Sequence, residues 1–443
     1  MNTDLQPTLH AYRASLLHFT ADPAFDADAH VWHADGLLIV DGERILAAGD
    51  YATLKATLPD QVAITDYRGK LIVPGFIDTH IHYPQTDMIA SPAPGLLPWL
   101  ETYTFPTERQ FSDPLHAREV ADFFLDELLR CGTTTAMVYC TVHPESVEAF
   151  FSASAARNLR MVAGKVMMDR HCPAFLQDTA EGGARDSELL INKWHQRGRQ
   201  MVAITPRFAP TSSDAQLQLA GELARAYPST FVQTHVAENT DEVAWVASLF
   251  PKARSYLDVY EQAGLLRERS MLAHCIWLDA DDRARMAATG AAVAICPTSN
   301  LFLGSGLFDF AAADAARMRL SLATDVGGGT AFSMLQTMNE TYKVARMGNT
   351  YLPALRMFYL ATLGAARSMQ LDGTIGNFAA GTEADFIVLD PQATPLLARR
   401  TARTDSLEEL LFAFAMLGDD RAVMATYSAG QIVHRRSGVQ RAD

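Results

Sequence analysis

The stretch VPGFIDTHIHYPQ, residues 73–85, places two histidines at the end of an apolar run that resembles a buried β-strand. Alternate side chains of a strand point to the same face, so His80 and His82 would lie about 6–7 Å apart along it. Two imidazoles at this spacing can reach one metal ion. The alternative is a pair of unrelated histidines at a strand end, and the rest of the chain decides between the two.

Seven more short apolar segments follow FIDTHIH (76–82), and most are separated by stretches with helical periodicity. They are TTTAMVYC (133–140), MVAGKVMM (161–168), MVAITPRF (201–208), FVQTHV (231–236), MLAHCI (271–276), AAVAICP (291–297) and LSLATD (320–325). Eight strands that alternate with helices predict an α/β fold, the (β/α)8 barrel of TIM type. A doubly wound open sheet is the main alternative.

Both ends of the chain carry short strand patterns that lie outside this barrel. GLLIVDGERILAAGD (36–50) contains an Asp-Gly hairpin turn between two strand patterns. ADFIVLD (384–390) and VMATYSAGQIVHRR (423–436) near the other end are also short strand patterns. We therefore expect residues 74–373 to form the barrel. Residues 1–73 and 374–443 should pair into one small composite β-domain, a β-sandwich.

Polar residues concentrate where the predicted barrel strands end, which is where active sites of such barrels lie. They are His80, His82, Arg207, His235, Glu238, His274 and Asp325. Each alone has an ordinary explanation, such as a core histidine with a hydrogen-bond partner or an aspartate in a turn. Together they predict a metal site of three imidazoles and one carboxylate. This set suits Zn2+, and Fe2+ would accept the same ligands.

Composition excludes several other classes of protein. The 443 residues are 49% hydrophobic and 20% charged, which is typical of a globular chain. The net charge of -14 would repel a nucleic-acid backbone. The five cysteines lack CxxC spacing, so neither a disulfide framework nor a thiolate zinc site is expected. The polar, acidic start is unlike a signal peptide, and no run of 18 apolar residues predicts a membrane span, so we expect a cytoplasmic protein.

The ordered motifs PGFIDTHIH, THVAEN, LAHC and LATD resemble the set that marks the amidohydrolase superfamily. Within it, the chain resembles the guanine deaminase family nearly from end to end. The more specific stretches are HYPQ (82–85), LLPWLETYTFPTE (96–108), TPRFAPTSS (205–213), CPTSNLFLGSG (296–306) and TDVGGGTAFSMLQTMNE (324–340). The resemblance implies a cytoplasmic, homodimeric, zinc-dependent hydrolase. It would convert guanine at C2 to xanthine and ammonia in purine catabolism.

The resemblance also implies a role for each candidate residue. His80, His82, His235 and Asp325 would bind one zinc ion. Glu238 would shuttle protons, His274 would orient the attacking water, and Asp325 would assist it. Gln85, Arg207, Phe208 and His235 would hold the purine, since a guanidinium suits a ring carbonyl and an aromatic ring can stack. The alternatives are a salt-bridged barrel arginine and an ordinary core phenylalanine.

Three alternatives differ from this interpretation in the number of metals, the substrate or the presence of catalysis. Relatives with two metals use a carbamylated lysine on the fourth strand, but MVAITPRF has none, so we expect a single-metal deaminase. Its substrate could be another amino-heterocycle, such as 8-oxoguanine, a pterin or a triazine. A non-catalytic scaffold would be expected to have lost metal ligands. The segment 83–112 is rich in proline and aromatic residues, and we expect it to wall the barrel mouth or to pack against a partner subunit.

Overall fold

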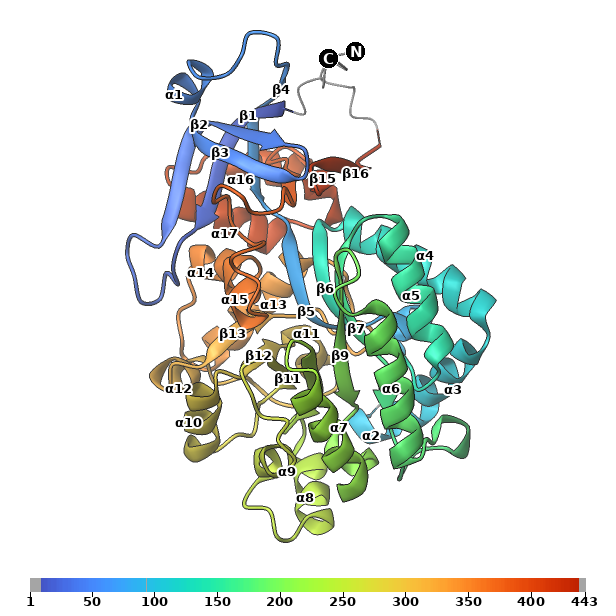
Figure 1. Ribbon diagram of the computed structural model, residues 1–443. Helices are drawn as coiled ribbons and strands as arrows, with labels where there is room; N and C mark the ends of the chain where they lie inside the picture. The colour runs from blue at the N-terminus through green and yellow to red at the C-terminus, as the bar shows by residue number, and fades with distance from the viewer. Residues whose placement is uncertain (1–8, 93, 438–443) are drawn as a thin grey trace, which may run out of the picture.

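The computed structural model describes residues 9–92 and 94–437, which form a parallel barrel with a seven-stranded sheet at one end of it (Figure 1). The barrel strands, in order around the sheet, are β5 (Phe76–His82), β6 (Thr133–Tyr139), β7 (Arg160–Gly164), β9 (Gln200–Pro206), β10 (Phe231–Val236), β11 (Ser270–His274), β12 (Ala292–Ile295) and β13 (Arg319–Leu322). The short β8 (Val166–Met167) also pairs with β9, so the third predicted strand is interrupted at Lys165. The predicted (β/α)8 barrel is confirmed.

The segment after β13 closes the barrel beside β5. The Asp325 backbone N–H donates to the His80 carbonyl oxygen at 2.9 Å, and the His82 N–H donates to the Val326 carbonyl oxygen at 2.7 Å. The Thr79 hydroxyl donates to the Leu322 carbonyl oxygen at 3.2 Å. The first and last strands are therefore neighbours, and this excludes the open sheet.

Helices follow most strands and cover the barrel. They are α2 (Leu96–Trp99), α3 (Phe105–Glu108), α4 (Pro114–Arg130), α5 (Pro144–Ala156), α6 (Ala180–Trp194), α7 (Asp214–Ala226), α8 (Thr240–Leu249), α9 (Tyr256–Gln262), α10 (Ala280–Thr289), α11 (Pro297–Phe302), α12 (Phe310–Ala315), α13 (Met334–Met347), α14 (Ala354–Leu360) and α15 (Leu363–Ser368). Capping residues mark their ends: the Asp113 side chain accepts from Leu115 N at 2.9 Å at the start of α4, and Gly290 ends α10 in a left-handed conformation with a φ of 73°. Among the described residues, no helix has the length and hydropathy of a membrane span.

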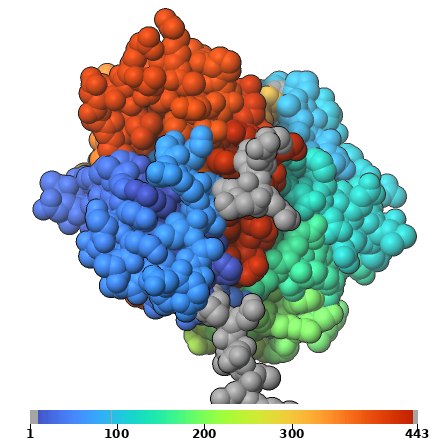
Figure 2. All heavy atoms as spheres, turned by 90° about the horizontal axis from the view of Figure 1, so that it is seen from above, coloured from blue at the N-terminus to red at the C-terminus, as the bar shows by residue number. Residues whose placement is uncertain are grey.

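Both ends of the chain contribute to the seven-stranded sheet. Its strands, in spatial order, are β16 (Gln431–Arg435), β15 (Val423–Ser428), β14 (Phe386–Leu389), β4 (Ile64–Pro74), β1 (Leu9–Phe19), β2 (His30–Asp41) and β3 (Arg44–Asp50), with α1 (Tyr51–Lys55) following β3. Figure 2 shows the N-terminal and C-terminal parts side by side on one face. The rings of Tyr12 and Tyr427 lie 5.1 Å apart although β1 and β15 are three strands apart, about 14 Å in a flat sheet. The sheet therefore folds over its own aromatic core, as in a sandwich.

Two helices between β14 and β15 were not predicted. They are α16 (Pro395–Thr401) and α17 (Leu407–Leu417), and α17 packs against α13 and α14 of the barrel. The sequence of α17, LEELLFAFAML, begins after the cap Ser406, whose hydroxyl accepts from Glu409 N at 3.2 Å. The strand patterns on either side predict a continuous β-region across this helical segment. The domain division at residues 73/74 and 373/374 stays a prediction.

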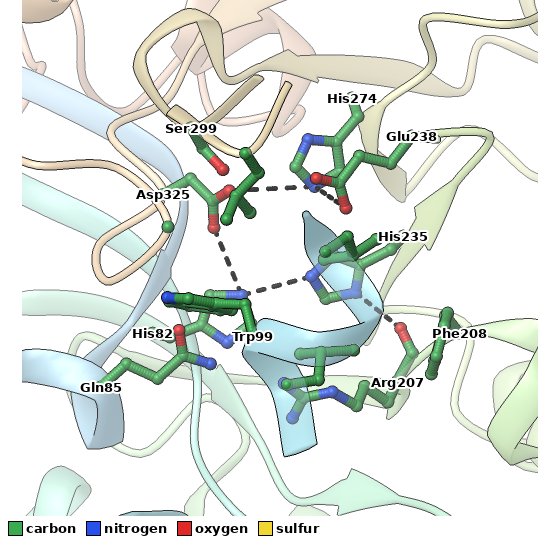
Figure 3. A pocket seen from close by; sticks show the side chains of 14 residues that line it. His82, Gln85, Trp99, Arg207, Phe208, His235, Glu238, His274, Ser299 and Asp325 are labelled. Atoms are coloured by element: carbon green, nitrogen blue, oxygen red, sulfur yellow. Dashed lines mark hydrogen bonds and ion pairs between the residues drawn. The ribbon is translucent and has the colours of Figure 1, made fainter. Parts of the chain in front are cut away.

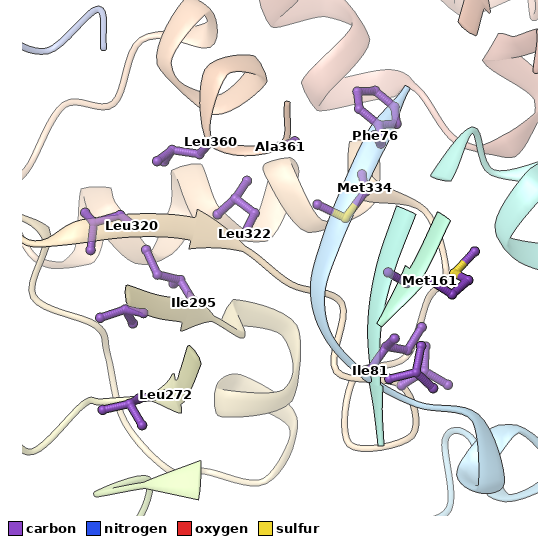
Figure 4. Close-up of a cluster of buried hydrophobic side chains, with 14 of the residues drawn as sticks. Phe76, Ile81, Met161, Leu272, Ile295, Leu320, Leu322, Met334, Leu360 and Ala361 are labelled. Carbon is purple, nitrogen blue, oxygen red and sulfur yellow. The ribbon is translucent and has the colours of Figure 1, made fainter. Parts of the chain in front are cut away.

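The pleat of the barrel strands separates the packing side chains from the polar ones. Ile81, Leu272 and Leu322 point out of the barrel, where they pack with residues of the covering helices such as Met334 and Leu360 (Figure 4). Their neighbours along the strands face the other way, because successive side chains of a strand point to opposite faces. His80 and His82, which flank Ile81, are thereby brought to the inner face of the barrel.

A buried ionic cluster joins the sheet to the barrel at the amino ends of the barrel strands. Glu383 accepts hydrogen bonds from Arg160 Nε at 2.7 Å and from Arg199 Nη2 at 2.6 Å, and Arg199 also binds Asp385. The side chain of Glu383 is only 6% exposed. Because the strands run away from this cluster, it lies at the opposite end of the barrel from the polar strand ends.

Replacing Glu383 by Gln should lower the free energy of unfolding by about 3 kcal/mol, since the loss of one partner leaves buried guanidinium groups under-compensated. Burial raises the pKa of Glu383, but Arg160 and Arg199 outweigh it and hold the pKa below its ordinary value. The carboxylate therefore stabilises the fold above the pKa of unfolded glutamate, and this contribution is lost as the pH falls through the lower folded pKa. Urea unfolding at several pH values measures both effects. Equal acid sensitivity of variant and wild type would contradict the assignment.

Candidate active site

Three imidazoles converge at the carboxyl end of the barrel. His82 Nε2 lies 3.2 Å from His80 Nε2 and 3.2 Å from His235 Nε2. Two ligands of one tetrahedral zinc ion are about 3.3 Å apart, given Zn–N bonds of 2.0–2.1 Å. Uncharged imidazoles gain little by pointing these nitrogens at one another, so the arrangement fits a metal ion bound among them.

Asp325 supplies an oxygen to the same point. Its Oδ1 lies 3.1 Å from His80 Nε2 and 3.4 Å from His82 Nε2. Burial raises the pKa of this carboxyl, but its electrostatic and hydrogen-bond interactions with the neighbouring histidines, His80 first, outweigh burial and lower the pKa to about 2. The following glycines let the backbone turn tightly here, since a Cβ on Gly329 would lie 1.8 Å from the Thr324 carbonyl oxygen. Asp325 is therefore a permanently charged potential ligand.

The histidines are held in the form that binds metals. Burial lowers the pKa of His80, His82 and His235, which keeps the imidazoles neutral. His235 Nδ1 lies 2.7 Å from the Arg207 carbonyl oxygen. A carbonyl only accepts, so Nδ1 carries the proton and Nε2 presents its lone pair to the centre. His80, His82 and His235 form one group of converging potential ligands, and His80 and Asp325 also converge with His274 and Cys296. Since Asp325 Oδ1 lies close to both His80 and His82, the three histidines and Asp325 could hold one divalent ion with nitrogen and oxygen ligands.

Glu238 and His274 face each other beside this centre (Figure 3). His274 Nε2 lies 3.4 Å from Glu238 Oε2 and 3.8 Å from Asp325 Oδ2. Nε2 has no hydrogen-bond partner among residues 9–92 and 94–437, while Nδ1 donates to Asn300 Oδ1 at 2.8 Å. Burial and the nearby carboxylates raise the pKa of Glu238 to about 7, although His274 opposes the shift. Such a carboxyl can both take up and release a proton near neutral pH.

The backbone around Glu238 is fixed by a helix start. Glu242 Oε2 accepts hydrogen bonds from the N–H groups of Glu238 at 2.9 Å and Asn239 at 3.2 Å, which forms the capping box of α8. The Ser305 hydroxyl donates to Glu238 Oε1 at 2.9 Å. Oε1 of Glu238 is therefore held by a hydrogen bond from Ser305, and Oε2 faces His274.

A pocket opens over the centre and is lined by His82, Gln85, Leu96, Trp99, Leu100, Arg207, Phe208, His235, Glu238, His274, Ser299, Leu303, Asp325 and Gly328. Gln85 and Arg207 lie on the side away from Glu238 and His274 (Figure 3). Leu96, Trp99 and Leu100 come from the segment 83–112, which forms one wall of the pocket as expected. Flat aromatic and aliphatic surfaces with a few fixed polar groups suit a planar heterocycle.

Every candidate residue from the sequence lies at this site, but several of their partners were missed. Glu108 of α3 is fully buried and accepts from Arg207 Nη1 at 2.9 Å and from Gln85 Nε2 at 3.1 Å. Arg207 is therefore salt-bridged, which agrees with the alternative of a salt-bridged barrel arginine. It also lines the pocket. Asn300 and Ser305 lie within the stretch CPTSNLFLGSG, which had been singled out without a role for either residue. The resemblance of this stretch to the family was the available signal, but spacing alone could not pair its residues with His274 or Glu238.

Comparison with known proteins agrees with this geometry. Residues 71–433 match the model of the Amidohydrolase family. The chain is 49% identical to the guanine deaminase of Escherichia coli (strain K12), over 97% of this chain and 99% of that protein. It is also similar to the crystal structure of guanine deaminase from Bradyrhizobium japonicum, with a TM-score of 0.94, 37% identity and coverage of 97% and 100%.

A guanine deaminase from C. acetobutylicum, whose structure has guanine bound in the active site, is similar at 27% identity with a TM-score of 0.87. It covers 96% of this chain and 100% of its own. The family match spans most of the sequence and includes every strand that carries a polar residue of the pocket. This protein belongs to the amidohydrolase family.

Proposed function

We propose that the protein is a guanine deaminase, a hydrolase that acts on the C–N bond of a cyclic amidine. It replaces the 2-amino group of guanine with oxygen and gives xanthine and ammonia. The observation that carries this proposal is a buried carboxyl, Glu238, whose pKa is raised to about 7 and which lies beside a cluster of potential metal ligands and across a pocket from Arg207 and Gln85. The identity to guanine deaminases over nearly the whole chain supports the same activity.

We further propose that His80, His82, His235 and Asp325 hold one zinc ion, with Fe2+ as the alternative metal. A metal held there would polarise water and so supply a nucleophile at neutral pH. Glu238 takes up the proton that the attacking water loses. It delivers this proton to the unprotonated ring nitrogen next to C2, then takes the remaining proton of the new hydroxyl group on C2 and delivers it to the amino group, so that the C2–N bond breaks, ammonia leaves and the carbonyl at C2 forms.

Asp325 and His274 bracket the space in front of Glu238. Asp325, with its low pKa, stays ionised and can accept a hydrogen bond from the attacking water. His274 has its Nδ1 held by Asn300, so its Nε2 can bind the same oxygen. Overall, one guanine and one water become one xanthine and one ammonia. Guanine deamination of this kind belongs to purine catabolism, and we expect a cytoplasmic homodimer.

The remaining pocket residues hold the purine. Arg207 donates to the carbonyl oxygen at C6, because a guanidinium offers several donors in a plane. Gln85 offers one amide donor and one acceptor to the ring edge. Phe208, which is buried with Trp99 and Leu303, stacks on the ring. The pocket thereby turns C2 towards Glu238.

Arg207→Lys should raise KM for guanine about 10- to 100-fold with a smaller loss in kcat, since a charged hydrogen bond contributes about 1.5–3 kcal/mol. Lysine keeps the charge but loses the planar pair of donors. 2-Aminopurine is the matched control substrate, because it keeps the reacting amino group and lacks the carbonyl at C6. Steady-state kinetics with both should show a larger effect on guanine. Unchanged kcat/KM for guanine would contradict the role of Arg207.

Turnover of guanine by purified protein of known metal content tests the proposed function. Loss of guanine absorbance and release of ammonia should be fast, with about one metal ion per chain. 8-Oxoguanine, a pterin, a triazine and adenine are assayed alongside. Faster turnover of one of these would change the substrate, and no turnover with metal bound to the protein would contradict guanine deamination. Light scattering tests the homodimer.

A further inference from the structure

Glu108 is a buried carboxylate that lies behind the pocket and binds two of its polar residues. Its two oxygens both accept from Arg207 Nη1, each at 2.9 Å. Its Oε1 also accepts from Gln85 Nε2 at 3.1 Å. The side chains of Glu108 and Arg207 are 1% and 3% exposed, so water cannot replace these bonds. Glu108 does not line the pocket itself.

Glu108 determines which atoms of Gln85 face a ligand. An ionised carboxylate only accepts, so the amide nitrogen of Gln85 must face Glu108. The amide oxygen of Gln85 then accepts from Gly327 N at 3.2 Å, and both ends of the amide are fixed. Among the hydrogen bonds of residues 9–92 and 94–437, the second N–H and the second lone pair of this amide have no partner, so they can serve a ligand in the pocket. The amide of Gln85 therefore cannot flip without losing both contacts.

Glu108 also holds the guanidinium of Arg207. Nη1 is bound to Glu108, and the ring of Phe105, three residues earlier in α3, lies 5.6 Å from the guanidinium carbon. The backbone carbonyl of Arg207 meanwhile fixes His235. The short helix α3 thus holds Arg207 in place. The side chain of Arg207 lines the pocket, and its backbone carbonyl binds His235, a potential metal ligand.

The charge of Glu108 offsets the charge of Arg207. A buried ion pair presents donors to the pocket without a net positive charge, whereas an unpaired arginine would attract anions. This matters for the reaction because the product has a carbonyl in place of the 2-amino group, which makes its ring N–H more acidic than that of guanine. Part of the xanthine is anionic in mildly alkaline solution, while guanine stays neutral.

We propose that Glu108 is a positioning and specificity residue that orients Arg207 and Gln85 and neutralises the guanidinium, so that the pocket favours a neutral purine over a purine anion. The inference rests on the proposed function, because it assumes a purine in this pocket. The same neutralisation would favour product release, because anionic xanthine is then not held in the pocket by an unpaired positive charge on Arg207. A purely structural Glu108 would instead support the fold without discriminating between ligands.

The test uses two purines that do not react, so it is independent of turnover. Hypoxanthine has the C6 carbonyl, lacks the 2-amino group and is largely neutral, while xanthine is partly anionic in mildly alkaline buffer. Calorimetry measures the Kd of each for the metal-loaded wild type and for Glu108→Gln, which keeps the shape and removes the charge. We expect the preference for xanthine over hypoxanthine to rise about tenfold in the variant, the scale of one hydrogen bond.

Two further variants complete the experiment. Glu108→Asp keeps the charge on a shorter side chain, so it should weaken the binding of both purines. The ratio of the two Kd values should stay within about threefold of the wild-type ratio. Glu383→Gln removes a carboxylate from a buried arginine cluster at the far end of the barrel, so it should lower thermal stability and leave the ratio unchanged. If Glu108→Gln fails to fold, Glu108→Asp decides, because a tenfold change in its ratio would overturn the proposal.

An equal change in both affinities in Glu108→Gln, or no change, would show a structural role only and overturn the proposal. Failure of the wild type to bind either purine would overturn it as well. Wild-type turnover of guanine tests the proposed function on its own. An enzyme that binds both purines as described but does not deaminate guanine would separate the two conclusions.

Discussion

Glu238→Gln is expected to lower kcat for guanine by at least about 10³-fold, within the range that a positioned acid–base group contributes. Glutamine can still accept from Ser305 and fill the same space, but it cannot take up the proton that water must lose. The Glu238 carboxyl lies 3.4 Å from His274 and is not among the groups that converge on the metal, so the metal should stay bound. Stopped assays over long times and elemental analysis of the same preparation measure both.

A second buried carboxylate four residues away provides the control. Glu242 caps α8 and accepts from the Tyr256 hydroxyl at 2.6 Å, but it does not line the pocket. Glu242→Gln should therefore lower thermal stability and reduce kcat by less than about tenfold, since it removes hydrogen bonds and not the proton carrier. Near-normal kcat in Glu238→Gln, or an equal loss in both variants, would show that Glu238 does not carry the proton.

The fold could be predicted because its signals are local. Eight apolar segments and the helical periods between them follow from residues close together in the chain, and caps such as Asp113 and Gly290 mark helix ends. The folded terminal sheet could be predicted in outline from strand patterns at both ends. The helices α16 and α17 were missed because they interrupt a region whose flanking strands suggested a continuous β-unit.

The convergence of the potential metal ligands could also be predicted, because a barrel brings the carboxyl ends of its strands together whatever their separation in sequence. His80 and Asp325 are 245 positions apart, yet strand ends alone place them at one site. Their chemistry as ligands follows from residue type.

The supporting contacts could not be predicted, since they depend on how irregular segments cross the pocket. Glu108 precedes Arg207 by 99 positions and lies in a segment of short helical turns with no strand pattern. Nothing in its sequence says that its carboxylate meets the guanidinium. The same holds for Asn300, which reaches His274 from the start of α11. Such pairs decide the orientation of polar groups, and they require the three-dimensional structure.

His235→Ala is expected to remove most of the bound metal and to lower kcat/KM by at least about 10³-fold, because a catalytic metal contributes several kcal/mol. His235 Nε2 is one of three imidazole nitrogens at the centre, and its Nδ1 has no other role than to bind the Arg207 carbonyl among the contacts of the described residues. Added zinc should raise the melting temperature of chelator-treated wild type, since a ligand that binds only the folded state stabilises it by about 2.7 kcal/mol at 100 times its Kd.

The variant should show little of this zinc-dependent stabilisation, and this readout does not depend on activity. His195→Ala is the matched control: His195 is a half-buried histidine outside the pocket, whose Nε2 binds Ser229 and whose Nδ1 accepts from Val202 N at 3.1 Å in β9. The variant should keep its metal and its zinc response, with a loss of stability of about 1–3 kcal/mol because a buried N–H loses its partner. Full metal content and full zinc stabilisation in His235→Ala would contradict the ligand set. Loss of metal with retained turnover would contradict a metal-dependent reaction, and Glu238 would then have to act on water without help from an ion.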